Sequence, residues 1–482
     1  MSAATTFDNG EQPERPGRVR AAYAWAAGGT FGGQAALWLL SLAVMGVLQP
    51  SDYGLVGIIS VFYSYCRTVQ DAGLSTAIVQ RPELNRKLLS SAFWFYVSVG
   101  ILLMAVGIVT APLLGRLYHE PRLPAVMRVL AVNFIFLAVR TIPTALLTRA
   151  LNFRQRSTAE VAGSAANALT TAGLAFTGHG VWSLVIGGIV GEASLTLLIC
   201  WFARWRPAAE FDRAELFSLL HFGLPVMGSA LIWEFYIQSD FLMIGLILGP
   251  QQLGWYTLAW QLGMIPADRL TAVMNKANLP VLASLQKEPE RLRTHWRKVI
   301  EATAWLTFPM AAGLVLMGSD LIHTVLPAKW AGAEPVLPQL ALLGGIRSIA
   351  IVIPNLLTAV GRPGSVFIYN CVAAIIYPSA FALSARLGGI AAVGWAWVAI
   401  SSIMTLWLGR LGLKMSPIKL DDYFSPLRAP LLCTLSMSLV VLALKQVSFL
   451  SGLARVAVLV GAGVFSYAAF GFASFRRFMR NR

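Results

Sequence analysis

The sequence predicts an all-α polytopic membrane protein of about fourteen transmembrane helices. Hydrophobic residues make up 57% of the 482 residues and charged residues only 12%, whereas a typical soluble domain is about 25% charged. A soluble chain of this length would need several apolar cores, because one core stops growing near about 250 to 300 residues. Apolar runs of about 20 residues, the length that crosses the hydrocarbon of a bilayer, recur along nearly the whole chain.

Six of these runs form a predicted N-terminal bundle, residues 21–205. The predicted spans lie near residues 21–48, 54–79, 88–113, 125–147, 158–177 and 181–203. A polar segment, residues 1–20, precedes them and carries both signs of charge, so the first run does not have the form of a cleaved signal peptide. We expect this segment to be a cytoplasmic tail.

A second series of six runs forms a predicted C-terminal bundle, residues 224–413, after a cytoplasmic linker, residues 206–223. Its spans lie near residues 224–248, 253–284, 299–318, 337–360, 365–385 and 390–413. An appended region, residues 414–482, contains a last helix pair near residues 429–447 and 453–475 and ends in a basic cytoplasmic tail.

The distribution of Lys and Arg predicts the orientation in the membrane, because cytoplasmic loops hold an excess of both. One side of the predicted topology carries dense clusters, such as residues 287–298 and 476–482. The other side carries only Arg116, Arg122, Lys329, Arg386 and Lys445. Both termini are therefore predicted to be cytoplasmic. The net charge of +16 lies in short clusters between apolar runs, which does not favour nucleic-acid binding.

Short sequence matches predict that the two bundles are repeats of each other. The turn after the first span has the pattern Leu-x-Pro-x-x-apolar-Gly at residues 48–54, and the same pattern follows the seventh span at residues 248–254. Glu120-Pro121 matches Glu334-Pro335, and Ile142-Pro143 matches Ile353-Pro354. The alternative is that Pro and Gly only mark turns.

Ionisable residues within the predicted spans indicate a polar cavity between the bundles. A charge near the centre of a bilayer costs several kcal/mol, so it normally faces a bundle interior or a wet cavity. The residues are Arg67, Asp71, Arg140, Glu234, Asp240, Asp268, Arg269, Lys276 and Arg347. Arg67 and Asp71 are four residues apart and could pair on one helical face, as a structural staple or in the cavity. Arg269 and Lys276 could instead extend to the lipid headgroups.

The sequence contains no pattern typical of an enzyme. Its four cysteines, Cys66, Cys200, Cys371 and Cys433, are far apart within apolar spans, which favours neither a metal site nor disulfides. Neither a zinc-protease H-E-x-x-H motif nor a phosphate-binding G-x-x-x-x-G-K-[ST] loop is present. We therefore predict a protein without catalytic residues, bound metal or cofactor.

Several motifs resemble the bacterial oligosaccharide flippases, Wzx-type proteins of the polysaccharide biosynthesis group in the multidrug/oligosaccharidyl-lipid/polysaccharide exporter superfamily. These motifs are Pro50-x-Asp52-Tyr53-Gly54, the stretch QDAGLSTAIVQR at 70–81, SAFW at 91–94, LNFR at 151–154, GVWSL at 180–184, RWRP at 204–207 and FGLP at 222–225. The resemblance covers roughly residues 20–415 and fades over the last two helices, whose number varies in the family.

The resemblance implies translocation of an undecaprenyl-diphosphate-linked oligosaccharide repeat unit across the inner membrane, for exopolysaccharide or lipopolysaccharide assembly. Polysaccharide polymerase and export machinery are expected partners. Fixed cations in a central cavity would bind the diphosphate, and the candidates are Arg67, Arg140, Arg269, Arg347 and Lys276. The two bundles would rock to give alternating access. Asp71, Glu234, Asp240 and Asp268 are candidates for coupling transport to H⁺ or Na⁺.

Two other functions stay open. A cation-coupled multidrug antiporter of the same superfamily should favour acidic residues in its cavity. A polysaccharide polymerase or ligase should carry an external loop with Arg and His, for which His323 and Lys329 are a weak match. The sequence does not specify the sugar composition, the coupling ion, the polysaccharide pathway, the oligomeric state or the role of the last two helices.

Overall fold

The protein is an all-α polytopic membrane protein, as predicted. The computed structural model describes residues 37, 40–71, 78, 85–150, 152–267, 285, 288–415, 418–447 and 451–480. Every regular element within these ranges is helical. Nine of the described helices are long and apolar enough to cross a membrane, or ten if one bent helix pair forms a single span. The total of fourteen stays a prediction, because parts of the first, second and eighth predicted spans lie outside the described residues.

The described N-terminal half begins with the helix Leu40–Val47, which meets the next helix at a bend of 114°. The helices that follow are α2 (Pro50–Asp71), α4 (Arg86–Leu117), α5 (Leu123–Leu130), α6 (Asn133–Arg149), α7 (Phe153–Phe176) and α8 (Val181–Ala203). The side chain of Asn85 caps α4 by accepting a hydrogen bond from the backbone nitrogen of Leu88 at 2.6 Å, which satisfies one of the unpaired donors at the helix start.

The second half contains longer helical elements. They are α9 (Arg213–Ile237), α10 (Ser239–Gly263), α12 (Pro289–Val325), the 3-10 helix η2 (Ala328–Ala333), α13 (Leu337–Ala350), α14 (Val352–Ala359) and α15 (Pro363–Met415). Gly249 (φ 84°) interrupts α10 and Gly389 (φ 64°) interrupts α15. Both have positive φ, which favours glycine, and both fall at predicted turns between spans. α9 begins at Arg213, within the predicted linker.

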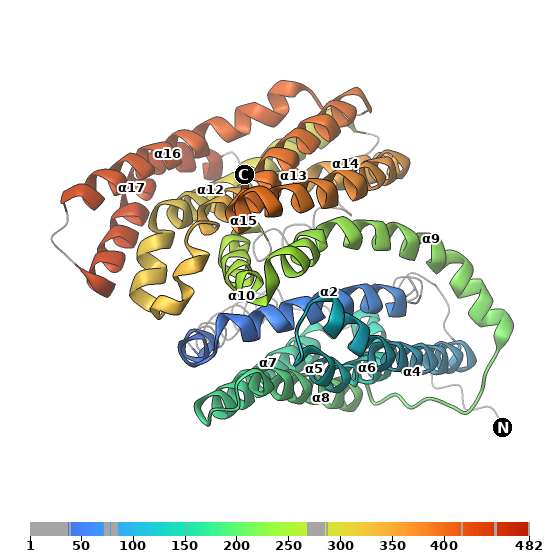
Figure 1. The fold of residues 1–482 in the computed structure, drawn as a ribbon. Coiled ribbons are helices and arrows are strands. Elements are labelled where there is room, and N and C mark those ends of the chain that lie inside the picture. The colour runs from blue at the N-terminus through green and yellow to red at the C-terminus, as the bar shows by residue number, and fades with distance from the viewer. Residues whose placement is uncertain are drawn as a thin grey trace.

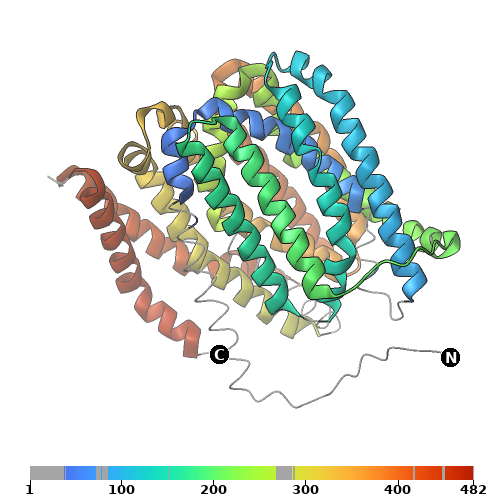
Figure 2. The same ribbon diagram turned by 90° about the horizontal axis from the view of Figure 1, so that it is seen from below.

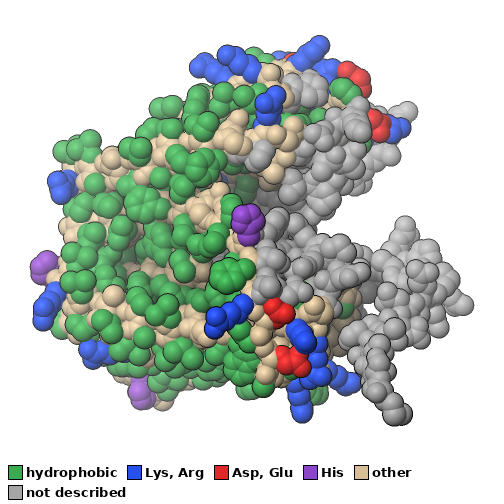
Figure 3. All heavy atoms as spheres, turned by 90° about the vertical axis from the view of Figure 1, so that its right-hand side faces the viewer, with side chains coloured by type: hydrophobic (Ala, Val, Ile, Leu, Met, Phe, Trp, Pro, Cys, Tyr) green, Lys and Arg blue, Asp and Glu red, His purple; other side chains and the backbone are tan. Residues whose placement is uncertain are grey.

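The halves form two layers, with α2–α8 in one layer and α12–α17 in the other (Figure 1). α9 and α10 lie between the layers. The appended helices, α16 (Leu420–Val447) and α17 (Gly452–Arg480), pack against α12 at the edge of the molecule farthest from α4 (Figure 2). Hydrophobic side chains cover much of the face in Figure 3, as expected of a surface that contacts lipid.

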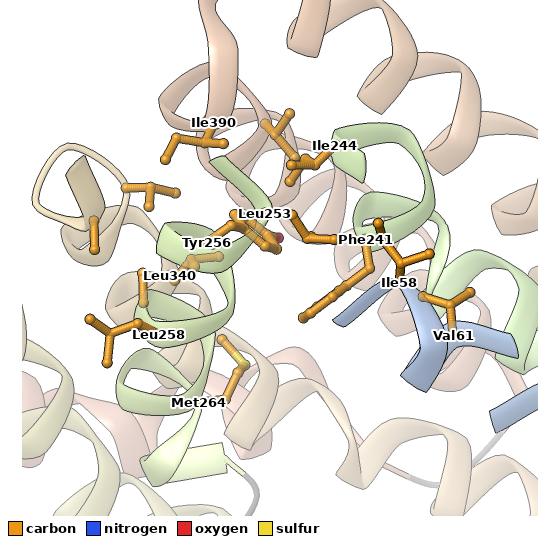
Figure 4. Close-up of a cluster of buried hydrophobic side chains, with 14 of the residues drawn as sticks. Ile58, Val61, Phe241, Ile244, Leu253, Tyr256, Leu258, Met264, Leu340 and Ile390 are labelled. Carbon is orange, nitrogen blue, oxygen red and sulfur yellow. The ribbon is translucent and has the colours of Figure 1, made fainter. Parts of the chain in front are cut away.

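The main contact between the two halves of the chain joins α2 to α10. Ile58 and Val61 of α2 approach Phe241, Ile244 and Leu253 of α10 in one buried cluster (Figure 4). Leu55, Ile244 and Leu253 are fully buried. In a membrane such contacts depend on close packing, because lipid tails are as apolar as the side chains that they would replace.

The repeated Pro and Gly motifs meet each other across this contact. A Cβ atom on Gly54 would lie 1.7 Å from the carbonyl oxygen of Pro250, and a Cβ on Gly254 would lie 1.8 Å from that of Pro50. This contact is reciprocal, as expected where two repeats are related by a pseudo-two-fold axis. We call this end of the bundle the Pro50 end.

Two further features have the same symmetry. In the first half, Tyr118 packs where a side chain on Gly245 would have to lie. In the second half, Trp330 binds the carbonyl oxygen of Met45. Met45 and Gly245 are equivalent positions of the two repeats, each five residues before the repeated proline. The fourth span of each half is also broken, at residues 131–132 between α5 and α6 and at residue 351 between α13 and α14. These contacts support the predicted repeat.

Candidate functional site

A cavity of about 850 Å³ lies toward the end of α2 that is opposite the Pro50 end. Its walls come from α2, α6, α7 and α8 of the first half and from α9 of the second. The cavity brings together four of the predicted site residues, which are Arg67, Asp71, Arg140 and Glu234. α9 therefore carries the contribution of the second half to this site.

Two of these residues have partners from other helices. Arg140 of α6 forms an ion pair with Glu192 of α8. Glu234 of α9 accepts hydrogen bonds from the Ser64 hydroxyl of α2 and, at 3.1 Å, from the Gln238 side chain. These contacts tie α6 to α8 and α2 to α9, so the polar walls of the cavity also hold its helices together.

Arg67 differs from the other arginines of the cavity. Its side chain is exposed, and within the described ranges it has no ion pair with Asp71 or another acid, so the pairing that its spacing allowed is not present. Arg156 of α7, in contrast, binds Glu160 at 2.9 Å and the Thr148 hydroxyl at 3.2 Å. The guanidinium of Arg67 is thus available to a ligand.

One face of α6 lines the cavity with hydroxyl groups. Thr141, Thr144 and Thr148 donate hydrogen bonds to the backbone oxygens of the residues four positions earlier, at 2.7, 2.7 and 2.8 Å. Because these hydroxyl protons are used within the helix, the remaining lone pairs of the oxygens can accept hydrogen bonds from a ligand in the cavity. A wall of acceptors suits a ligand rich in hydroxyl donors.

The charge of the lining is mixed, although the sequence predicted a cationic cavity. Three arginines, Arg67, Arg140 and Arg156, and three carboxylates, Asp71, Glu160 and Glu234, line it. Sequence reasoning did not select Glu192, Glu160 or Arg156 as site residues. A signal for Glu192 was available, since it is the one acid in the apolar run of the sixth span.

Asp240 and Arg347 do not line this cavity. Asp240 is fully buried and accepts hydrogen bonds from the Tyr256 hydroxyl at 2.6 Å and the Trp397 indole at 2.9 Å. The Arg347 guanidinium lies 5.7 Å and 5.5 Å from the ring centres of Trp260 and Trp397, within the range of cation–π attraction.

Glu234 and Asp240 are six residues apart, so their side chains leave the helical path in different directions. The role of both Asp240 and Arg347 in transport stays a prediction. Asp268, Arg269 and Lys276 lie outside the described residues.

At the Pro50 end, ion pairs fix the start of α2 to the connection between α4 and α5 within the first half. Arg122 binds Asp52 and Glu120, each at 2.9 Å. Burial raises the pKa of Glu120, but the hydrogen bonds and charge of Arg122 lower this pKa more, so it lies below its ordinary value.

Residues of the second half contact the end of the helix Leu40–Val47. The Trp330 indole donates to the oxygen of Met45 at 2.8 Å, and the Lys329 ammonium donates to those of Gly46 and Val47 at 3.0 Å. His323 binds Glu334 at 2.9 Å. Lys329 and His323, the weak match to an external loop of a polymerase or ligase, thus have separate partners.

Comparison with known proteins gives consistent matches over most of the chain. This chain is 25% identical to the teichuronic acid biosynthesis protein TuaB of Bacillus subtilis (strain 168), over 84% of each chain. It is 24% identical to the lipopolysaccharide biosynthesis protein WzxC of Escherichia coli (strain K12), over 77% of this chain and 76% of that protein.

The structure also resembles that of the lipid II flippase MurJ in an inward closed conformation. The two share 15% of their residues with a TM-score of 0.73, over 93% of this chain and 98% of that chain, which shows a common fold. A family described as polysaccharide biosynthesis protein matches residues 45–335, more than half of the chain. The chain therefore belongs to the polysaccharide biosynthesis protein family.

Proposed function

We propose that this protein is a flippase that moves an undecaprenyl-diphosphate-linked oligosaccharide repeat unit across the bacterial inner membrane. It would serve the assembly of an exopolysaccharide or lipopolysaccharide and would itself catalyse no covalent step. The names of its relatives, which refer to biosynthesis of teichuronic acid and lipopolysaccharide, support this class of cargo.

The observation that carries the proposal is the cavity itself. It lies among membrane-spanning helices, is closed at the Pro50 end and contains both the hydroxyl wall of α6 and Arg67, which has no acidic partner among the described residues. A diphosphate needs fixed hydrogen-bond donors such as guanidinium groups. Sugar hydroxyls need acceptors, which the threonines provide.

The orientation follows from the excess of Lys and Arg predicted for cytoplasmic loops. It places the Pro50 end at the periplasm and the cavity toward the cytoplasm, where the lipid-linked substrate is made. The two halves would then rock apart at the Pro50 end to release the cargo outward. Asp71 and Glu234 of the cavity, with Asp240 and Asp268, stay the proposed groups for coupling to H⁺ or Na⁺.

Complementation tests the proposal. The wild type and its Arg67→Ala and Arg156→Ala variants are expressed at matched membrane levels in a strain that lacks its own repeat-unit flippase, and surface polysaccharide is measured. We expect Arg67→Ala to lose at least about tenfold in transport, because a charge-assisted contact to phosphate contributes about 1.5–3 kcal/mol. Arg156→Ala, whose arginine already binds Glu160, should retain most activity.

Failure of the wild type in strains with several different cargoes would contradict the flippase proposal. A drug efflux assay on the same strains then tests the antiporter, for which the three carboxylates of the lining are the favouring observation.

A further inference from the structure

Glu192 is a charged residue of the site that the proposed function does not explain. It lies in an apolar run of α8, between Gly191 and Ala193. Its side chain is 30% exposed and forms an ion pair with Arg140, which is 14% exposed and lines the cavity. A charged pair at this depth is costly to maintain, so it is usually functional.

The carboxylate of Glu192 occupies the guanidinium of Arg140, which is one of the cations of the cavity that the proposed substrate could bind. A guanidinium binds a carboxylate and a phosphate through the same fork of N–H donors, so a diphosphate that reaches Arg140 competes with Glu192. Once displaced, the carboxylate of Glu192 would be left partly buried without its cation, and such a group becomes neutral by taking up a proton.

The charges around Glu192 do not provide a second fixed partner. α8 packs against α2, α5, α6 and α7. The ionisable groups near Glu192 are Arg140 of α6 and Tyr63 of α2, and the Tyr63 hydroxyl is within electrostatic reach of Glu192, Arg140 and Arg67. The neighbouring stretch of α8 at Gly187 and Gly191 meets Asn167 and Thr171 of α7, which do not ionise. The charged residue of α5, Arg128, is exposed.

We infer that Glu192 is an exchangeable partner of Arg140, which the substrate's diphosphate displaces and which takes up a proton as the substrate binds. This inference rests on the proposed function and adds a proton-binding residue to it. Release of the diphosphate on the other side of the membrane reverses the exchange: Glu192 loses its proton there and binds Arg140 again. One proton thus moves outward with each substrate, so any use of an inward cation gradient depends on the other acidic groups.

Calorimetric binding of undecaprenyl diphosphate to the purified full-length protein tests the inference. Titrations in two buffers with different ionisation enthalpies give the number of protons taken up per bound lipid. We expect about one proton for the wild type and none for Glu192→Gln. The variant should also bind on the order of tenfold more tightly, because its amide competes weakly for Arg140.

Glu288→Gln is the control, because Glu288 also pairs with an arginine, Arg291 at 2.7 Å, but does not line the cavity. It should keep the proton uptake of the wild type. A purely structural pair between α6 and α8 predicts instead a less stable Glu192→Gln protein and no proton uptake by the wild type. Binding without proton uptake by the wild type therefore overturns this inference and leaves the flippase intact. No binding at all by the wild type overturns the proposed function and the inference together.

Discussion

The two ends of α2 contact the rest of the protein by different means. At the Pro50 end, backbone meets backbone, since Gly54 and Gly254 leave no room for a side chain against Pro250 and Pro50. At the other end, Arg67 and Asp71 face a cavity of about 850 Å³. One helix of 22 residues therefore both seals the halves together and lines the site between them.

This difference indicates how the two halves can separate at the Pro50 end while the rest of the protein stays folded. Close packing at glycines is strong only while the two surfaces match, because van der Waals attraction decreases steeply with distance. Polar contacts across the halves, such as those of Lys329 with Gly46 and Val47, can be exchanged for water. The Pro50 end combines both kinds of contact, so substitutions there should shift the balance between sealed and open states by graded amounts.

The largest effect is expected from Gly54→Ala or Gly254→Ala. Each added methyl would lie within 2 Å of a backbone oxygen, and overpacking of this severity costs at least about 3 kcal/mol. The Pro50 end should fail to close, and transport should be lost. In a chain without its native cysteines, Thr68→Cys in the cavity should become reactive to an impermeant maleimide added from the side that we assign to the periplasm.

Gly188→Ala provides the control for this substitution. Gly188 lies in α8, and a Cβ there would meet nothing within 4 Å. Its transport and labelling should match those of the wild type. Normal transport by Gly54→Ala would show that the Pro50 end does not need this close contact.

A smaller effect is expected from Arg122→Ala. The side chains of Asp52 and Glu120 are 7% and 10% exposed and would lose their cation, while the 45% exposure of Arg122 itself reduces the cost. We expect the sealed state to lose about 1–2 kcal/mol, measured as roughly tenfold faster labelling of the same cavity cysteine. Arg116→Ala should have no effect, because Arg116 is exposed and forms no side-chain contact within the described residues.

The Arg122 pair also predicts a pH dependence. The pKa of Glu120 is lowered in the folded protein, so its contribution to the seal is present above the ordinary pKa of 4.5 and is lost as the pH falls through the folded value. Maleimide reacts with the thiolate, so labelling must be compared with that of a fully exposed cysteine at the same pH. Relative to that reference, labelling of the wild type should accelerate below about pH 4.5, and Arg122→Ala should show a weaker acceleration. An equal acceleration in both proteins would assign the pH dependence to another group.

Hydropathy and turn residues predicted most of the fold. The described helices agree with the predicted spans because every apolar run must satisfy its backbone as a helix in lipid. Turns at Gly249 and Gly389 were predictable from residue type, and so was the repeat of Pro50 and Gly54. Helix ends were less predictable: α12 begins ahead of its predicted span, since a helix can continue into water once the hydrocarbon ends.

The site was only partly predictable, because a sequence reports the depth of a charge but not the direction of its side chain. Arg67 and Arg140 were selected by depth and do line the cavity. Asp240 has similar depth, but its side chain points away from the cavity, toward Tyr256 and Trp397. Glu192 was missed although it met the same criterion of a charge within a span.

The smallest effects are expected where the second half caps the helix Leu40–Val47. The last carbonyl groups of a helix lack partners within the helix, and here Trp330 and Lys329 donate to them. Trp330→Phe keeps the buried ring but leaves the oxygen of Met45 unpaired, which should cost about 1 kcal/mol. Lys329→Met should cost less than about 0.5 kcal/mol, because water can replace its exposed ammonium. Cavity labelling should therefore accelerate about fivefold for Trp330→Phe and less than about twofold for Lys329→Met. Equal rates for the two variants would mean that burial of the donor does not decide the strength of this cap.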